Sequence, residues 1–338
     1  MGIKEIAEKA GVSKTSVSLA LNGHKGVGLE TRMTIIKLAK EMNYRVPGER
    51  SYALPHHKVI VLAKLSKHGL ILNEDQNSFI VNYIEGINQV VKKHGYSFEI
   101  ITHTLESLTP FIAEMKSKQP TGIIVLGTEL SSLDIQSLKD LNYPYVVIDT
   151  YFEQLEADFI TMGNIGAVFT IISYLVERHH TDIRMVTSSV RTGNISLRER
   201  GFMQAMNEYG LTLSVQSLIP VQPGFKGAYE DMLAYLQGGG HLPQALFCFN
   251  DVAAFGVIKA LKEAGFKVPR DVSVIGFDDL PMSSMMEPRL TTIRVPNQHI
   301  GALAARTIVE KIIAKTKEAP LGILVHGKLV IRESVIDR

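Results

Sequence analysis

The chain has 338 residues, of which 45% are hydrophobic and 21% charged, values that exclude a disordered protein and are typical of a soluble globular one. At roughly 100–200 residues per domain, this length predicts two or three domains. Residues 1–58 hold ten lysines and arginines against five acidic residues, a net charge of +5, so the total of +2 leaves −3 for the rest. A basic head on a mildly acidic body favours a polyanion as the partner of the head, with a basic surface of no function as the alternative.

The amino-terminal residues 3–43 are expected to form three short helices, within a first domain of residues 1–45. The first should end at Gly11, which tolerates a positive φ. Ser13 is suited to cap the second helix, and the third is expected over about 30–43.

The tight turn between the first two helices predicts a helix-turn-helix that binds double-stranded DNA. The apolar residues of the second helix can face the other two helices, which leaves a short polar face of the kind that enters a major groove. An ordinary helical hairpin is the alternative. The residues expected at the DNA are Ser13, Lys14, Thr15, Ser16, Ser18, Leu19 and Asn22.

The pattern of apolar and polar residues changes between this head and the rest of the chain. Residues 46–58 are expected to form a hinge, in which Pro47 and Pro55 bracket a segment long enough for one helical turn. From Val59 onward, apolar strand-like runs alternate with amphipathic helical patterns, which predicts parallel sheets covered by helices on both faces. The number of units is too large for one compact sheet, so two Rossmann-like lobes are expected. The predicted strands are 59–63, 98–101, 122–126, 145–148, 183–187, 245–249 and 272–277.

Polar residues follow several of these predicted strands, where open α/β sheets bind ligands. Carboxylates accept hydrogen bonds from hydroxyl groups and an arginine donates them, so this set suits a polyhydroxylated ligand. Capping of a strand or helix end is the alternative for Asp149 and Asn250, and it is the favoured role for Asp251. The residues concerned are Asp149, Arg198, Asn250, Asp251, Asp278 and Asp279.

Several motifs together resemble the lactose-repressor (LacI/GalR) family of bacterial regulators, in the correct order over nearly the whole chain. The head carries IAEKAGVSKTSVSLALNG and TRMTIIKLAKEMNYRVP. Downstream, the matching segments are Asn77–Ile87, Arg198–Phe202, Phe249–Gly256, Val268–Asp279, Pro288–Thr292 and Val330–Ser334.

This resemblance implies a fold of two parts: an all-α helix-turn-helix DNA-binding domain, then an α/β periplasmic-binding-protein-like domain of two Rossmann-like lobes with parallel sheets. The effector and dimerisation domain would span 59–338. Its first lobe is expected at about 59–158 and 292–322, and its second at about 159–291 and 323–338.

The resemblance also implies partners and site residues. We expect a homodimer on palindromic operator DNA, controlled by a small-molecule effector, most simply a carbohydrate, held between the lobes. The implied effector contacts are Asp149, Arg198, Asn250 and Asp278, with Phe79 and Phe225 as aromatic walls. A core position is the alternative for Phe79.

Two departures from the family pattern affect the DNA contact. Leu19 stands where many members have an arginine, so one donor to guanine is missing. Leu54 matches the leucine that wedges into the minor groove in the family, but Pro55 follows it directly. We therefore expect a linker that is disordered without DNA and forms only a partial hinge helix on it.

Other classes of function fit the sequence less well. A ligand carrier of the periplasmic type would share the lobes, but the basic head and the absence of a signal peptide argue against it. Enzyme motifs such as GxSxG, HExxH and GxGxxG are absent from the sequence. Cys248 is the single cysteine, so no disulfide forms within the chain. We expect a cytoplasmic regulator with no cofactor, metal or membrane partner.

Overall fold

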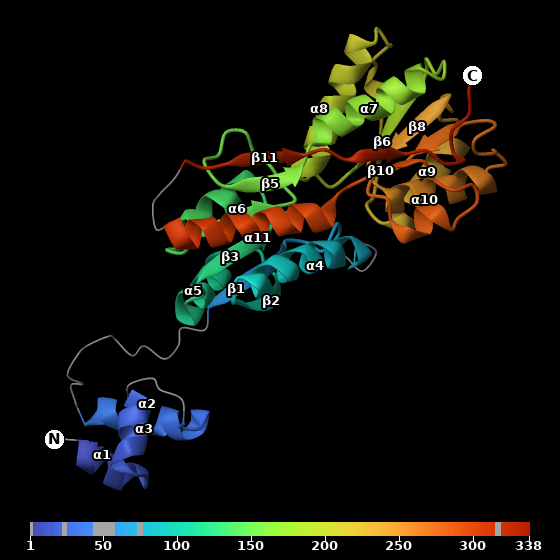
Figure 1. The fold of residues 1–338 in the computed structure, drawn as a ribbon. Helices are drawn as coiled ribbons and strands as arrows, with labels where there is room; N and C mark the ends of the chain where they lie inside the picture. Colours follow the sequence, from blue (N-terminus) through green and yellow to red (C-terminus); the bar gives the residue numbers. More distant parts are fainter. Residues whose placement is uncertain (1–2, 22–25, 43–57, 73–76, 315–318) are drawn as a thin grey trace. The chain divides into compact units, whose positions relative to one another are not determined.

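The computed structural model describes residues 3–21, 26–42, 58–72, 77–314 and 319–338 (Figure 1). The chain forms two compact units, Met1–His57 and Lys58–Arg338. Asn22, Leu54 and nearly all of the expected hinge lie outside the described residues. No helix in the described ranges is both long and apolar enough to cross a membrane.

The first unit contains three helices, α1 (Ile3–Ala10), α2 (Lys14–Leu21) and α3 (Leu29–Glu41). The turn between α1 and α2 is built as expected, because Gly11 has φ +65° and the Val12 N–H donates to the Ala7 carbonyl at 3.0 Å. The Ser16 N–H donates to Ser13 Oγ at 3.0 Å, so Ser13 caps α2. All three helices supply the core, which contains Ile6, Ala7, Val17, Ala20, Leu21, Ile35 and Ala39.

The second unit begins with a six-stranded parallel sheet in the order β11-β5-β4-β3-β1-β2. Its strands are β1 (Val59–Ser66), β2 (Ser97–Thr104), β3 (Gly122–Leu126), β4 (Tyr145–Ile148), β5 (Phe159–Met162) and β11 (Gly322–Val325). Alternate residues of β1 point to opposite faces, Ile60 and Leu62 into one apolar cluster, Val61 and Ala63 into another. Helices α4 (Asn77–Lys93) and α11 (Asn297–Ala314) cover the first face, and α5 (Thr109–Lys118) and α6 (Ser132–Ser137) cover the second.

A four-stranded parallel sheet in the order β7-β6-β8-β9 forms the centre of the second lobe. Its strands are β6 (Ile183–Ser188), β7 (Leu218–Val221), β8 (Ala245–Cys248) and β9 (Ser273–Ile275). Two pairs of helices pack against it (Figure 1): α7 (Asn164–Val176) with α8 (Gly193–Glu208), and α9 (Phe225–Gln237) with α10 (Asp251–Glu263).

The chain passes between the lobes slightly later than expected. Strand β5 still pairs with β4 in the first lobe, and β11 pairs with β5, so the first sheet extends beyond the expected limits at about 158 and 322. Two further strands lie where the chain passes between the lobes, and we call them the crossover strands. They are β10 (Thr292–Arg294) and β12 (Lys328–Val330), which form an antiparallel pair.

A close helix crossing joins α4 to α11, the two helices on one face of the first sheet. A Cβ atom on Gly86 would lie 1.9 Å from the carbonyl oxygen of Gln298, and one on Gly301 would lie 2.4 Å from that of Tyr83. The backbones therefore touch directly, and only glycine fits at either position.

We expect Gly86→Ala to lower the free energy of unfolding by about 1–3 kcal/mol, because the added methyl group must displace backbone. Gly166→Ala is the matched control: this helical glycine is exposed and a Cβ atom there would meet nothing closer than 4.0 Å. The control should be neutral or stabilising by up to ~1 kcal/mol. Urea unfolding at a fixed protein concentration measures both, and equal stabilities of the two variants would contradict the close crossing.

Candidate functional site

The site lies where the carboxyl ends of strands from both sheets meet. In each sheet the strand order reverses once, between β1 and β3 in the first and between β6 and β8 in the second. Such reversals open a crevice at the carboxyl ends of the strands, because the connections on either side leave in opposite directions.

A small cavity of about 40 Å³ lies at this place. The first lobe contributes side chains that follow β1, β3 and β4, and the second lobe contributes side chains that follow β6, β8 and β9. The lining residues are Ile71, Leu72, Phe79, Thr128, Asp149, Thr192, Asn194, Ile195, Arg198, Phe249, Asn250 and Asp278.

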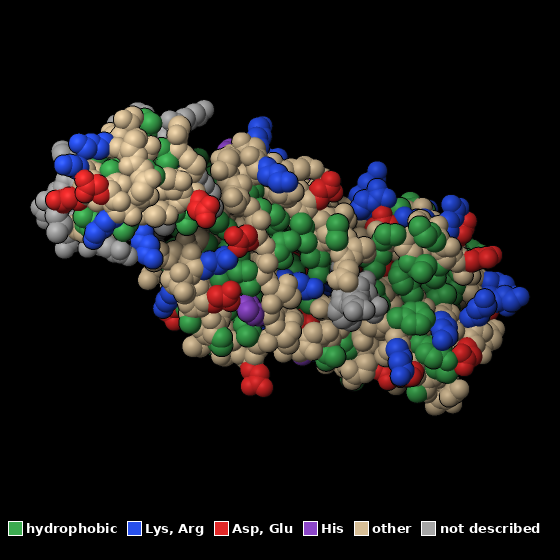
Figure 2. Space-filling model, turned by 90° about the horizontal axis from the view of Figure 1, so that it is seen from below, with side chains coloured by type: hydrophobic (Ala, Val, Ile, Leu, Met, Phe, Trp, Pro, Cys, Tyr) green, Lys and Arg blue, Asp and Glu red, His purple; other side chains and the backbone are tan. Residues whose placement is uncertain are grey.

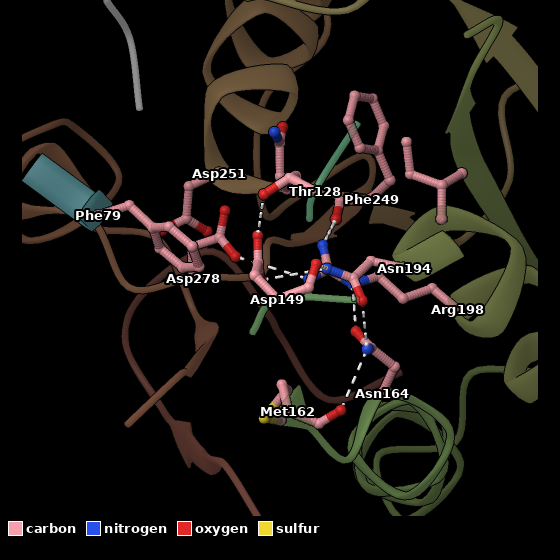
Figure 3. A network of polar contacts seen from close by, with 12 residues as sticks. Phe79, Thr128, Asp149, Met162, Asn164, Asn194, Arg198, Phe249, Asp251 and Asp278 are labelled. Atoms are coloured by element: carbon pink, nitrogen blue, oxygen red, sulfur yellow. Dashed lines mark hydrogen bonds and ion pairs between the residues drawn. The ribbon is translucent and has the colours of Figure 1, made fainter. Parts of the chain in front are cut away.

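Arg198, on the cavity side of α8, is the central charged group (Figure 3). Its side chain is only 7% exposed. The guanidinium donates from Nε to Asn164 Oδ1 at 2.9 Å and from an Nη atom to the Phe249 carbonyl at 2.5 Å. It also lies over the Phe277 ring, 3.6 Å from the ring centroid, and 3.8 Å from the Asp278 carboxylate. These contacts fix the planar group in one orientation at the floor of the cavity.

Asp149 is the acidic counterpart from the first lobe. It follows β4 with φ +59°, and its carboxylate accepts from Thr128 Oγ1 at 2.5 Å, Tyr83 Oη at 3.2 Å and Asn194 Nδ2 at 3.1 Å. Asn194 belongs to the second lobe, and it also accepts from Asn164 Nδ2 at 3.0 Å. The hydrogen bonds therefore run without a break from Asp149 in the first lobe to Arg198 in the second.

The charges of this cavity are held in an apolar setting. Burial raises the pKa of Asp278 well above its usual range, although the charge of Arg198 opposes this. Burial likewise raises the pKa of Asp149, against the hydrogen bond from Thr128 and the charge of Arg198. Two carboxyl groups that are costly to ionise, beside a fixed guanidinium, can exchange hydrogen bonds with the hydroxyl groups of a ligand.

Asn250 and Asp251 have different roles at the start of α10. Asn250 lines the cavity, and its Oδ1 also accepts from the Ala253 N–H at 2.8 Å, so it caps the helix. Asp251 does not cap the helix, contrary to expectation. Its buried carboxylate accepts from the Leu280 N–H at 2.8 Å, from Ser283 Oγ at 2.6 Å and from Thr292 Oγ1 at 2.6 Å, because the turn after β9 and strand β10 pack directly on it.

The two expected aromatic walls behave differently. Phe79 lines the cavity and packs edge-to-face on Tyr83, with ring centroids 5.4 Å apart, so it is both a wall and a core residue. Phe225 does not reach the cavity. It begins α9, is 40% exposed, and its ring lies beside Lys259. The reason is the packing of α9 on α10, in which the carbonyl group of Phe225 lies so close to Gly256 that a Cβ atom there would be 2.4 Å away.

Sequence reasoning missed several lining residues. Thr128 follows β3 as Asp149 follows β4, and Asn194 follows β6, so the rule for strand ends applied to every strand would have found both. Asn164 and Tyr83 do not line the cavity themselves but hold residues that do, Arg198 and Asn194 in one case and Asp149 in the other. Asn164 follows β5, a strand that was not expected, and Tyr83 lies within α4, where no strand-end rule applies.

The head presents the other candidate surface. Lys14 and Thr15 are exposed on α2, and Ser16, Ser18 and Leu19 are half-buried. Ser13 and Ser16 are engaged in the cap, with their Oγ atoms 2.9 Å apart. Among the described residues, no cluster of histidine, cysteine or acidic side chains could hold a metal ion.

Asp251 predicts a pH dependence of stability. Burial raises its carboxyl pKa from 3.8 to about 6, so the folded state binds this proton more tightly than the unfolded state, and stability falls as the pH rises through 6. Relative to Asp251→Asn, the wild-type domain should gain about 1 kcal/mol between pH 7 and pH 5. Chemical unfolding across this range measures the difference, and parallel pH profiles would contradict the assignment.

Comparison with protein families identifies both parts of the chain. Residues 2–46 match the family described as bacterial regulatory proteins, lacI family. Residues 172–335 match the family described as periplasmic binding protein-like domain.

Relatives and solved structures match over nearly the full length. The chain is 31% identical over 340 residues to the HTH-type transcriptional repressor PurR of Edwardsiella ictaluri (99% of this chain, 97% of the relative), and 30% identical over 343 residues to that of Pasteurella multocida (99% of both). The fold is similar to that of the lac repressor dimer bound to operator and the anti-inducer ONPF (20% identity, TM-score 0.76) and the transcriptional regulator CelR–cellobiose complex (21%, TM-score 0.73), each over 99% of both chains. It is also similar to a LacI-family regulator from Enterococcus faecium with bound ribose (24%, TM-score 0.69, 83% of this chain and all of the other).

With a three-helix head, two parallel-sheet lobes around a buried polar cavity, and full-length relatives at 30–31% identity, the chain belongs to the LacI family of bacterial regulatory proteins and is an effector-controlled, DNA-binding transcriptional regulator rather than an enzyme.

Proposed function

We propose that this protein is a homodimeric repressor of palindromic operator DNA in the cytoplasm, and that a sugar or sugar derivative bound between its lobes controls it. The observation that carries the proposal is the placement of Asp149, Arg198 and Asp278 around one buried cavity, in a chain that begins with a helix-turn-helix.

The cavity chemistry supports a polyhydroxylated effector. Carboxyl and amide oxygens can accept from hydroxyl groups, Arg198 can donate to them, and the Phe79 ring offers an apolar wall for the C–H face of a sugar ring. Two structural relatives hold the sugars cellobiose and ribose. A cavity of about 40 Å³ is smaller than a sugar, so uptake requires the lobes to separate.

The control of DNA binding follows from this separation. An effector that binds one arrangement of the lobes more tightly than another shifts the population toward that arrangement. The hinge at residues 46–58 would then pass the change to the heads. The boundaries of head, hinge and lobes are part of this proposal.

A dimer explains the apolar face of the second unit. Figure 2 shows hydrophobic side chains gathered on the face seen from below. Val81 on α4 is 57% exposed, and Met282 and Met285 after β9 are 55% and 76% exposed. Large exposed apolar side chains on both lobes favour a contact with a second copy, which would place two heads on two half-sites.

The helix α2 assignment predicts effects on operator binding. Lys14→Ala should weaken binding by about 1–3 kcal/mol, and it should reduce the salt slope by about 1 for a phosphate contact or relax one base preference for a guanine contact. Fluorescence anisotropy on a DNA site selected from a random pool measures this, with Lys37→Ala of α3 as the charge-matched control. Unchanged affinity and specificity in Lys14→Ala, Thr15→Ala and Ser18→Ala together would refute the recognition helix.

The cavity assignment predicts loss of effector response without loss of DNA binding. Among mono- and disaccharides screened for raising the melting temperature, any sugar that stabilises the wild type should bind Asp278→Ala more weakly by about 2–5 kcal/mol, because the sugar loses the Asp278 carboxyl group as a buried hydrogen-bond partner. Phe225→Ala is the control and should respond as the wild type does. A normal response of Asp278→Ala would contradict the site.

A further inference from the structure

A second cavity, of about 440 Å³, lies between the lobes beside the effector cavity and shares Thr192 with it. One face of α8, formed by Gly193, Ser196, Leu197 and Arg200, lines it from the second lobe. The loops that follow β3 and β4 line it from the first lobe. This cavity is therefore a second place where the lobes meet, and Thr192 is the lining residue that it has in common with the effector cavity.

One ion pair spans this meeting place. Arg200 on α8 donates to both carboxylate oxygens of Glu153, at 2.7 and 3.2 Å. Glu153 lies in the loop between β4 and β5, two strands of the first sheet, while α8 lies between β6 and β7 of the second sheet. The pair therefore connects the lobes in bidentate geometry, which holds a fixed separation better than a single contact does.

A close steric contact between the lobes lies on the same face of α8 as Arg200, two helical turns earlier in the helix. A Cβ atom on Gly193 would lie 2.5 Å from Thr150 Oγ1 and 3.4 Å from the Phe152 ring, both in the first lobe. The amino-terminal end of α8 thus touches the first lobe directly, and only because residue 193 has no side chain.

We propose that the Arg200–Glu153 pair, with the close seat of Gly193, is a latch that holds the two lobes together beside the effector cavity and thereby sets how readily the lobes open for effector exchange. The proposal rests on the proposed function only for the identity of the cavity as the effector site. Opening of the lobes itself is measurable without effector or DNA.

A neighbouring ion pair provides the matched control. Arg191 lines the same cavity and donates to Glu199 at 2.7 Å, but both residues belong to the second lobe. Arg191→Gln removes one arginine from this cavity without cutting a connection between the lobes.

The test is a distance measurement by electron spin resonance on the full chain. Spin labels on Leu133→Cys in α6 and Val215→Cys report one distance between the lobes, since both positions are exposed, 73% and 98%. Cys248 is fully buried and its pKa is raised by burial, so it should not label. Labelled subunits are diluted into an excess of unlabelled protein so that one distance is seen per dimer.

We expect Arg200→Gln to raise the ratio of open to closed lobes about two- to five-fold, the range typical of exposed ion pairs, and Arg200→Glu to raise it further by repulsion. The exchanged pair Arg200→Glu with Glu153→Arg should restore the wild-type distribution. Gly193→Ala should open the lobes although Arg200 and Glu153 are both still present, and Arg191→Gln should match the wild type. Salt at about 1 M should open the wild type but change Arg200→Gln little.

A wild-type distribution in both Arg200 variants would overturn the latch. Failure of the exchanged pair to restore closure would also overturn it, since the effect would then belong to Arg200 alone. An opening in Arg191→Gln equal to that in Arg200→Gln would show a general effect of charge. DNA binding, measured separately by anisotropy, decides the proposed function whichever way the lobes respond.

Discussion

The burial of one guanidinium group organises the effector domain. Taking a charged arginine out of water is costly unless hydrogen bonds and opposite charge compensate for it. Burial lowers the pKa of Arg198, and the nearby Asp278 and Asp149 oppose that shift. Asn164, the Phe249 carbonyl and the Phe277 ring complete its surroundings. These partners come from separate helices and strands. The desolvation cost of Arg198 is therefore compensated only when the second lobe is folded around it.

The turn after β9, which contains Asp278 and Asp279, connects the cavity to the segments that pass between the lobes. The Asp278 N–H donates to the Ile293 carbonyl of β10 at 2.8 Å. The next residue, Asp279, accepts from Arg294 and Arg332, each at 2.6 Å, and these arginines lie in and beside the two crossover strands. Both aspartates have positive φ, at 119° and 58°, so the backbone there is held in a conformation that only its contacts maintain. Under the proposed function, a ligand that moves Asp278 would act directly on β10 and, through Asp279, on the segment that follows β12.

The fold was largely predictable from the sequence, and the site was predictable in part. The helical head and the parallel sheets follow from apolar periodicity and from turn residues such as Gly11 and Ser13, whose effects are local. Five strands were missed, β5, β7, β10, β11 and β12, each only three or four residues long. Strand β5 also lies only ten residues beyond β4 and has no helix before it. Asp149, Arg198, Asn250 and Asp278 all line the cavity, since each follows a buried strand. The resemblance placed Phe225 there as well, but its position depends on the packing of α9 against α10, which no local pattern reveals.

The role of Asp251 also depends on tertiary packing that the sequence pattern does not reveal. A polar residue at the start of a helix reads as a cap, and Asn250 fulfils that role. The carboxylate of Asp251 instead meets Thr292, 41 residues away in the chain, through a contact that only the tertiary fold creates. Sequence pattern identifies which residues stand at strand ends. Tertiary packing determines which of these residues line the cavity and which, like Asp251, form hydrogen bonds within the protein.

The most direct measurement is the operator affinity of the full chain with the cavity empty and with it filled by a sugar that stabilises the protein. Titrations at constant salt would follow DNA binding by anisotropy in both conditions. The account predicts that occupation of the cavity changes the dissociation constant by about 5- to 150-fold, the range of ordinary allosteric coupling. An identical dissociation constant with the cavity occupied and empty would contradict it.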